Sequence, residues 1–142
     1  MSAEGNAALA RKIYDLWNAR DLDAALDLAT DDVDITLMAY GQTLTGRDGF
    51  RRFMERFAIA FPDMKKEVTN QVASEDQVVM EFRLRGTHDG PLQTPAGEIP
   101  PTGKAVDLRV IEVLGIRDSR VAVLRNYSDT ATLMRQLGLN GR

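Results

Sequence analysis

The first sixty residues place apolar side chains at helical spacing, with one short alternating stretch between them. A first helix is expected over roughly residues 5–19, because apolar residues fall at i, i+4, i+7 and i+8: Leu9, Ile13, Leu16 and Trp17. A second, short helix begins after Asp21 as its cap and carries Leu22, Ala25, Leu26 and Ala29. A third opens at Thr45-Gly46-Arg47-Asp48 and ends before Pro62, with an apolar face of Phe50, Phe53, Met54, Phe57 and Ala58. Between the second and third helices, alternation predicts a strand through Val33, Ile35 and Leu37.

Beyond residue 62 the apolar period changes from helical spacing to two, which is typical of strands. One strand carries its apolar residues on a single face: Val78, Met80, Phe82 and Leu84. A loop rich in proline and glycine follows over residues 89–103, and a long strand over 104–117 turns at Asp118-Ser119 into a last strand over 120–127. Asp129 is then placed to cap a final helix that Gly138 ends.

Helices followed by hairpin-connected strands predict an α+β fold with helices on one face of an antiparallel sheet. With 142 residues the chain is expected to form a single domain over 1–142. A strongly bent sheet with the N-terminal helices on its concave face would form a cone with one open end. Six aromatic side chains are candidates for lining such a cone and contacting a ligand, or for simply filling it: Trp17, Tyr40, Phe53, Phe57, Phe61 and Phe82.

Composition and charge exclude several classes of function. The formal charge is −3, and the 18 Lys and Arg residues are scattered, so no basic stripe for nucleic acid is present. No apolar run approaches the roughly 20 residues of a membrane span, and the first residues lack a signal-peptide pattern, so a cytoplasmic protein is expected. With no cysteine, one histidine (His88) and no glycine-rich nucleotide fingerprint, we expect no metal, flavin or nicotinamide cofactor.

Three segments, in this order and spacing, carry a resemblance to a known family. They are Arg85-Gly86-Thr87-His88-Asp89-Gly90, Ile99-Pro100-Pro101-Thr102-Gly103-Lys104, and the stretch from Asp129-Thr130-Ala131-Thr132 through Gln136-Leu137-Gly138. Together with Phe61-Pro62-Asp63-Met64, the series resembles the SnoaL-like polyketide cyclases, within the nuclear-transport-factor-type superfamily of cone-shaped domains. The resemblance spans nearly the whole chain and implies the same fold.

The resemblance also implies a reaction, an intramolecular aldol closure without metal or cofactor, in which an aspartate near the end of the last strand acts as acid and base. That position is occupied here by Asn126, and a pocket histidine of the cyclases corresponds to Glu112. An amide cannot exchange a proton near neutral pH, although it can donate a hydrogen bond to a substrate oxygen. Glu112 can titrate, so we expect Glu112 to carry the proton and Asn126 to hold a substrate oxygen, with His88 or Arg125 assisting.

Three alternatives remain open. The segment Arg125-Asn126-Tyr127-Ser128-Asp129 also resembles limonene-type epoxide hydrolases, which likewise place a catalytic aspartate where Asn126 stands. Relatives of the cyclases that lack the aspartate are assigned to hydroxylation steps in aromatic-polyketide pathways. Loss of the acid could also leave a non-catalytic module that binds a small apolar or aromatic molecule.

The geometry of the last hairpin decides which residues meet. A two-residue loop alone places Glu112 opposite Arg125 as a cross-strand ion pair, whereas a three-residue loop with a bulge places Glu112 opposite Asn126. The family resemblance favours the second arrangement, and His88 is either a residue at the pocket mouth or an ordinary turn histidine. The uncovered outer face of the sheet is expected to form a homodimer through Ile111, Val113, Val121 and Val123.

Overall fold

A computed structural model describes residues 2–139 of the chain. The helices are α1 (Ala3–Asn18), α2 (Leu22–Leu26), α3 (Gly46–Ala60) and α4 (Thr130–Gln136). The strands of the main sheet are β1 (Ala29–Leu37), β2 (Gln42–Thr45), β3 (Lys65–Ala73), β4 (Gln77–Thr87), β7 (Ala105–Arg117) and β8 (Arg120–Ser128). A separate hairpin consists of β5 (Leu92–Thr94) and β6 (Gly97–Ile99).

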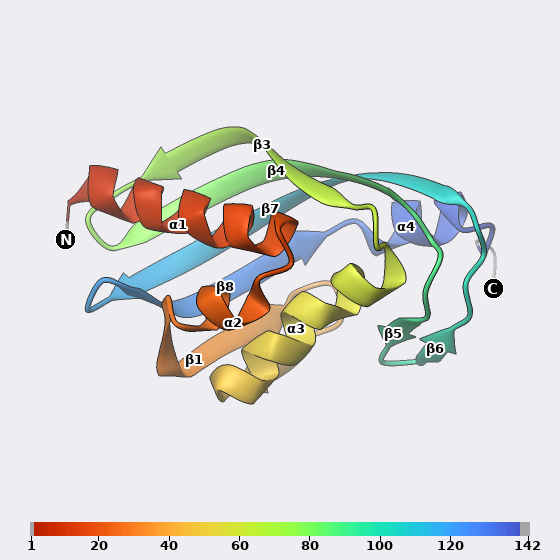
Figure 1. Ribbon diagram of the computed structural model, residues 1–142, viewed down its shortest axis with the longest axis horizontal. Helices are drawn as coiled ribbons and strands as arrows, with labels where there is room; N and C mark the ends of the chain where they lie inside the picture. Colours follow the sequence, from red (N-terminus) through yellow and green to blue (C-terminus); the bar gives the residue numbers. More distant parts are fainter. Residues whose placement is uncertain (1, 140–142) are drawn as a thin grey trace.

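Six strands form one open, curved sheet in the order β2-β1-β8-β7-β4-β3. All neighbouring pairs are antiparallel except β1 and β8, which run parallel. Helices α1, α2 and α3 lie along the concave face, and α4 packs at the far end against β7 (Figure 1). The predicted α+β fold, a cone-shaped curved sheet with the N-terminal helices on its concave face, is therefore confirmed. The sheet was predicted to be antiparallel, and the parallel β1–β8 pair is the exception.

The helix caps follow the sequence signals. Asp21 accepts a hydrogen bond from the Ala24 backbone N–H at 3.2 Å and caps α2. Asp129 accepts from the Thr132 N–H at 3.0 Å and caps α4, as predicted.

No helix among residues 2–139 has the length and apolar content to cross a membrane.

The loop predicted over residues 89–103 contains the β5–β6 hairpin, which was not predicted. Gly90 precedes it at a crowded point, where an added Cβ would lie 2.1 Å from the carbonyl oxygen of Ile59. The Gly90 N–H donates to the Ala60 carbonyl at 3.1 Å, so the loop is tied to the end of α3. Only a residue without a side chain fits this approach.

The hairpin of β7 and β8 brings Glu112 and Asn126 face to face, as predicted. The predicted bulge is present, but the predicted three-residue loop is not. The loop has two residues, Asp118 and Ser119, with φ values of 53° and 61° that are typical of a type I′ turn. The shift in register comes from Ala122, an extra residue that forms a bulge within β8.

The bulge at Ala122 also changes which residues face outward near the turn. Val121 was predicted to lie on the outer face, but it is fully buried in the core, because an extra residue reverses the alternation of the strand. Val113 and Val123 are half-buried on the outer face, and Ile111 is 40% exposed. Three of the four predicted outer-face residues therefore lie there.

Candidate active site

Between the concave face of the sheet and the helices α1 and α3 lies a small inner cavity of about 30 Å³. Aromatic and aliphatic side chains line most of it, including Trp17, Phe53, Phe57 and Phe82. The polar side chains in its wall are Arg56, Lys66, Glu112, Asn126 and Ser128. Its volume is about that needed for one water molecule, so a larger ligand requires the wall to move.

The carboxylate of Glu112 is the centre of this site. Glu112 is 1% exposed, and each of its two carboxylate oxygens accepts a hydrogen bond. The Tyr14 hydroxyl donates to Oε1 at 2.5 Å, and the Asn126 amide Nδ2 donates to Oε2 at 2.9 Å. Burying a carboxylate destabilises a fold unless the group is hydrogen-bonded and near a cation. Here donors from α1 and β8 supply the hydrogen bonds.

Tyr14 joins the site from the C-terminal half of α1. Its ring packs edge-on against Phe82, with centroids 5.0 Å apart. Burial first, and then the charge and hydrogen bond of Glu112, raise the pKa of Tyr14 well above its ordinary value. The phenol therefore remains protonated at all physiological pH values and acts as a fixed donor to Glu112.

Lys66 on β3 points its ammonium group into the same region, inside a set of aromatic rings. Its Nζ lies 4.6 Å from the ring centroid of Tyr14, 4.8 Å from that of Trp17 and 5.5 Å from that of Phe82. Burial lowers the pKa of Lys66, and the Glu112 carboxylate partly offsets this effect. The three ring faces stabilise the cation in place of water.

Asn126 keeps unused hydrogen-bonding capacity. Its Oδ1 is buried and has no hydrogen-bond partner among the described residues, and one N–H of its amide group is not needed for Glu112. The assignment of nitrogen and oxygen follows from the neighbouring carboxylate, which can only accept when ionised. Asn126 can therefore present both an acceptor and a donor to a ligand.

Taken together, these groups can perform proton transfer and stabilise negative charge. Glu112 can take and return a proton, the Asn126 amide can hydrogen-bond a substrate oxygen, and Lys66 supplies a positive charge close by. Residues 2–139 contain no cluster of three acidic or histidine side chains with the arrangement of a metal site.

Of the six aromatic residues named from the sequence, four line the inner cavity: Trp17, Phe53, Phe57 and Phe82. Trp17 is held by a hydrogen bond from its indole N–H to the Met54 carbonyl at 3.0 Å. Phe61 is fully buried away from the cavity, and Tyr40 is half-buried against the core. These two aromatics serve packing in this structure.

His88 does not join Glu112 and Asn126. It follows β4, is fully buried, and stacks at a tilt against Phe61, with centroids 5.4 Å apart. Its Nδ1 accepts from the Thr102 backbone N–H at 3.2 Å and lies 2.9 Å from the Thr102 hydroxyl, so the ring proton sits on Nε2. Burial lowers the pKa of His88, which favours the neutral ring. In this position the histidine ties β4 to the segment before β7.

Arg125 also lies outside the cavity. It is adjacent to Asn126 in β8 and opposite Val113, so its side chain points to the outer face of the sheet. The structure therefore brings together Glu112 and Asn126 but places His88 and Arg125 elsewhere.

Tyr14, Arg56 and Lys66 were not identified from the sequence. Ala10, Ile13, Tyr14 and Trp17 fall at i, i+3, i+4 and i+7, so the helical stripe did contain a signal for Tyr14. Lys66 points to the same, inner face of β3 as Val68, two residues later. Arg56 lies about one helical turn after Phe53 on α3. A charged residue at such a position is usually solvent-exposed, so only the structure identifies these two.

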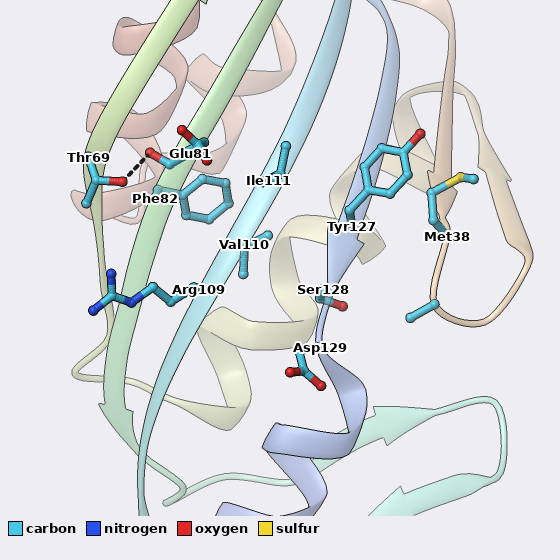
Figure 2. Close-up of a pocket in the computed structure, with 11 residues that line it drawn as sticks. Met38, Thr69, Glu81, Phe82, Arg109, Val110, Ile111, Tyr127, Ser128 and Asp129 are labelled. Atoms are coloured by element: carbon cyan, nitrogen blue, oxygen red, sulfur yellow. Dashed lines mark hydrogen bonds between the residues drawn. The ribbon is translucent and has the colours of Figure 1, made fainter.

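A second hollow, of about 530 Å³, lies on the outer face of the sheet (Figure 2). Met38, Ile111 and Tyr127 are each about 40% exposed there, and Glu81 and Arg109 lie across the strands from them. Its side chains include no buried titratable group. This hollow therefore lacks the buried acid or base that the inner cavity contains.

The open, arched sheet with three helices in its concavity defines a cone-shaped α+β domain of the nuclear-transport-factor type, with a buried polar site at its centre. Residues 7–137 match the family model described as SnoaL-like polyketide cyclase. The chain belongs to this family. A search among curated proteins finds no match by sequence.

Solved structures agree with this fold. A proposed SnoaL-like polyketide cyclase from Jannaschia sp. CCS1 is 23% identical, with 99% of this chain and 95% of that chain covered and a TM-score of 0.86. AclR from Streptomyces galilaeus, a proposed hydroxylase, is 24% identical, with coverages of 99% and 89% and a TM-score of 0.82. IdmH from Streptomyces antibioticus, a proposed polyketide cyclase, is 27% identical, with coverages of 94% and 98% and a TM-score of 0.75.

Proposed function

We propose that this protein is an enzyme that acts, without metal or organic cofactor, on an aromatic or polycyclic polyketide-like molecule. The reaction is cyclisation, or a hydroxylation step in the same kind of pathway. The observation that carries the proposal is the buried carboxylate of Glu112, held by Tyr14 and Asn126 in the wall of an aromatic-lined cavity. Buried ionisable groups in such a cavity are typical of catalytic sites.

For an aldol closure, the proposed roles are as follows. Glu112 removes a proton from the carbon next to a substrate carbonyl, and the resulting enolate oxygen is stabilised by the free N–H of Asn126 and the charge of Lys66. The enolate carbon then forms a bond to a second carbonyl carbon of the same molecule. The alkoxide formed takes the proton back from Glu112, so no oxidant or external acid is needed. Tyr14 remains a donor throughout and keeps the carboxylate oriented.

The test is Glu112→Gln, assayed by turnover across a panel of linear and partly cyclised aromatic polyketides. The glutamine keeps the shape and the Tyr14 hydrogen bond, and Asn126 can rotate its amide to match the new donor. Turnover should fall by about 10²–10⁴-fold, which is the usual contribution of a general acid or base. Ligand binding by calorimetry should change by only a few-fold. The matched control is Glu81→Gln on the outer face of β4, which should leave turnover unchanged.

A second candidate is a non-catalytic binding module, and one observation favours it. Both oxygens of Glu112 are already hydrogen-bonded, and the position that carries the aspartate in the resembling cyclases is Asn126. Under this alternative the carboxylate only orients Asn126, and Glu112→Gln changes ligand affinity without any turnover to lose. Full activity of Glu112→Gln on a true substrate would rule out the proton-transfer role.

The hydroxylation branch of the proposal has separate support. The fold is shared with AclR, a proposed hydroxylase, at a TM-score of 0.82. The absence of an aspartate at position 126 fits an enzyme that does not need the cyclase acid. Isotope-labelled oxygen gas separates the branches. Hydroxylation by O2 places one labelled atom in the product and reduces the other to water with two electrons and two protons from a hydroquinone ring of the aromatic substrate itself, which becomes a quinone. Cyclisation incorporates no labelled oxygen.

A further inference from the structure

Two cavities meet at the side chain of Arg56. The inner cavity of about 30 Å³ contains Glu112, and a groove of about 280 Å³ lies on the other side, between α3, β2 and the β5–β6 hairpin. Two residues line both spaces, Phe53 and Arg56. These two side chains therefore form the partition between the groove and the inner cavity.

Arg56 is a cation without an anion. Five other arginines in the described residues pair with carboxylates: Arg47, Arg51, Arg83, Arg85 and Arg117. Arg56 forms no ion pair or side-chain hydrogen bond within residues 2–139, and its Nε is buried without a partner. Its guanidinium lies instead 4.7 Å from the ring centroid of Phe57 and 5.8 Å from that of Phe53. A guanidinium has five N–H donors arranged to bind a carboxylate. In Arg56 the Nε–H is buried, and none of the five donors has a partner within residues 2–139.

The charges around the inner cavity also favour an anionic ligand. Arg56 and Lys66 are cations in its lining, and Glu112 is the carboxylate there, already bonded to Tyr14 and Asn126. The lining thus has one positive charge in excess. Burial lowers the pKa of the Arg56 guanidinium, and the Tyr40 and Glu112 side chains partly offset this effect. An anionic group on the ligand would pair with this excess charge in a region of low dielectric, where such a pair is strong.

We propose that the ligand of this site is an aromatic acid: its ring system lies in the groove, and its carboxylate pairs with Arg56 at the partition. This inference rests on the proposed function and adds the substrate class. The groove suits the ring system, since Leu37, Leu44, Ile59 and Pro95 provide apolar wall. Pairing draws the guanidinium off the rings of Phe53 and Phe57, which joins the groove to the inner cavity and to Glu112.

The experiment compares two probes of nearly equal shape, 2-naphthoate and 2-naphthamide, by calorimetry at neutral pH. The wild-type protein should bind the acid about tenfold more tightly than the amide, as a charge-assisted pair predicts. Arg56→Met keeps an apolar stem and should reduce that preference to less than about twofold, while amide binding persists. The matched control is Arg85→Met, which changes an exposed arginine that lines neither the groove nor the inner cavity and should keep the preference.

Folding of the variant is checked by its melting temperature, which should be equal to or above that of the wild type, because a half-buried cation whose buried Nε–H has no partner is removed. If Arg56→Met does not fold, Arg56→Lys takes its place and should lower the preference, since lysine lacks the planar fork. Equal affinity for acid and amide in the wild type overturns the acidic substrate class but leaves the proposed function standing. A preference that survives in Arg56→Met also overturns the inference. Failure of both probes to bind counts against the aromatic-ligand site itself, and therefore against the proposed function as well.

Discussion

Asn126→Asp would place a second carboxylate beside Glu112, at a position where the amide nitrogen now lies 2.9 Å from a carboxylate oxygen. Two like charges that relax to about 4 Å repel by about 4 kcal/mol at an effective dielectric constant near 20. This energy raises the pKa of the introduced aspartate from about 3.9 to about 7. The pair would therefore share one proton near neutral pH, and the protonated aspartate would donate to Glu112 as the amide does now.

The sign of the pH dependence follows from this rise. The folded-state pKa of the new carboxyl group lies above its unfolded value of about 3.9. Between these two pKa values the folded protein holds a proton that the unfolded chain has lost, so stability falls as pH rises through this range. The loss of stability should be about 4 kcal/mol at pH near 7 and only about 1 kcal/mol near pH 4.5. Urea denaturation of wild type and variant at both pH values measures the two differences.

The chain offers a matched control for this experiment. Asn70 donates to Glu81 at 2.7 Å in the same chemical arrangement, but the pair is exposed to solvent. Asn70→Asp should cost less than about 1 kcal/mol with little dependence on pH, because water screens exposed charges. A cost for Asn126→Asp that stays constant between the two pH values would refute the shared-proton reasoning.

Three further outcomes are expected. Gly90→Ala should lower the free energy of unfolding, measured by urea denaturation, by more than about 2 kcal/mol, because its Cβ would lie 2.1 Å from the Ile59 carbonyl oxygen. Gly41→Ala, at a φ of 65° with open space around it, should cost about 1 kcal/mol. We propose a homodimer through the outer hollow, so light scattering should give a mass of twice 15.8 kDa. Ile111→Lys should give the monomer, whereas the control Val72→Lys, at an exposed position of β3, should leave the dimer intact. Turnover should be unchanged by an excess of chelator and the purified protein colourless; activity lost to the chelator would show a metal requirement.

The repeating patterns allowed most of the fold to be predicted. Period-3.6 stripes identified α1 and α3, and period-two alternation identified β4, because burial of one face imposes these spacings on any sequence. The β5–β6 hairpin was missed, since each of its strands has only three residues and shows no alternation. The parallel pairing of β1 with β8 joins residues about ninety positions apart, and no local pattern specifies such a partner.

The candidate site was predicted only in part, for a different physical reason. Glu112 and Asn126 were identified because a family resemblance assigns their positions, but their pairing depends on a bulge at Ala122 that leaves no mark in the sequence. Lys66 and Arg56 were missed because burial of a cation is decided by its surroundings in three dimensions. A lysine on a polar strand has the same local pattern whether aromatic rings or water surround its ammonium group.

The position of Trp17 has a practical consequence, since it is the single tryptophan of the chain and stands in the wall of the inner cavity. Its indole is 2% exposed, lies 4.1 Å from the Arg20 guanidinium, and faces the Lys66 ammonium. Light emission from an indole responds to nearby charge and to contact with other rings. The protein thus contains its own optical reporter at the site, free of background from any other tryptophan. Emission excited near the red edge of the indole band would allow unlabelled compound libraries to be screened for the natural ligand in a plate reader.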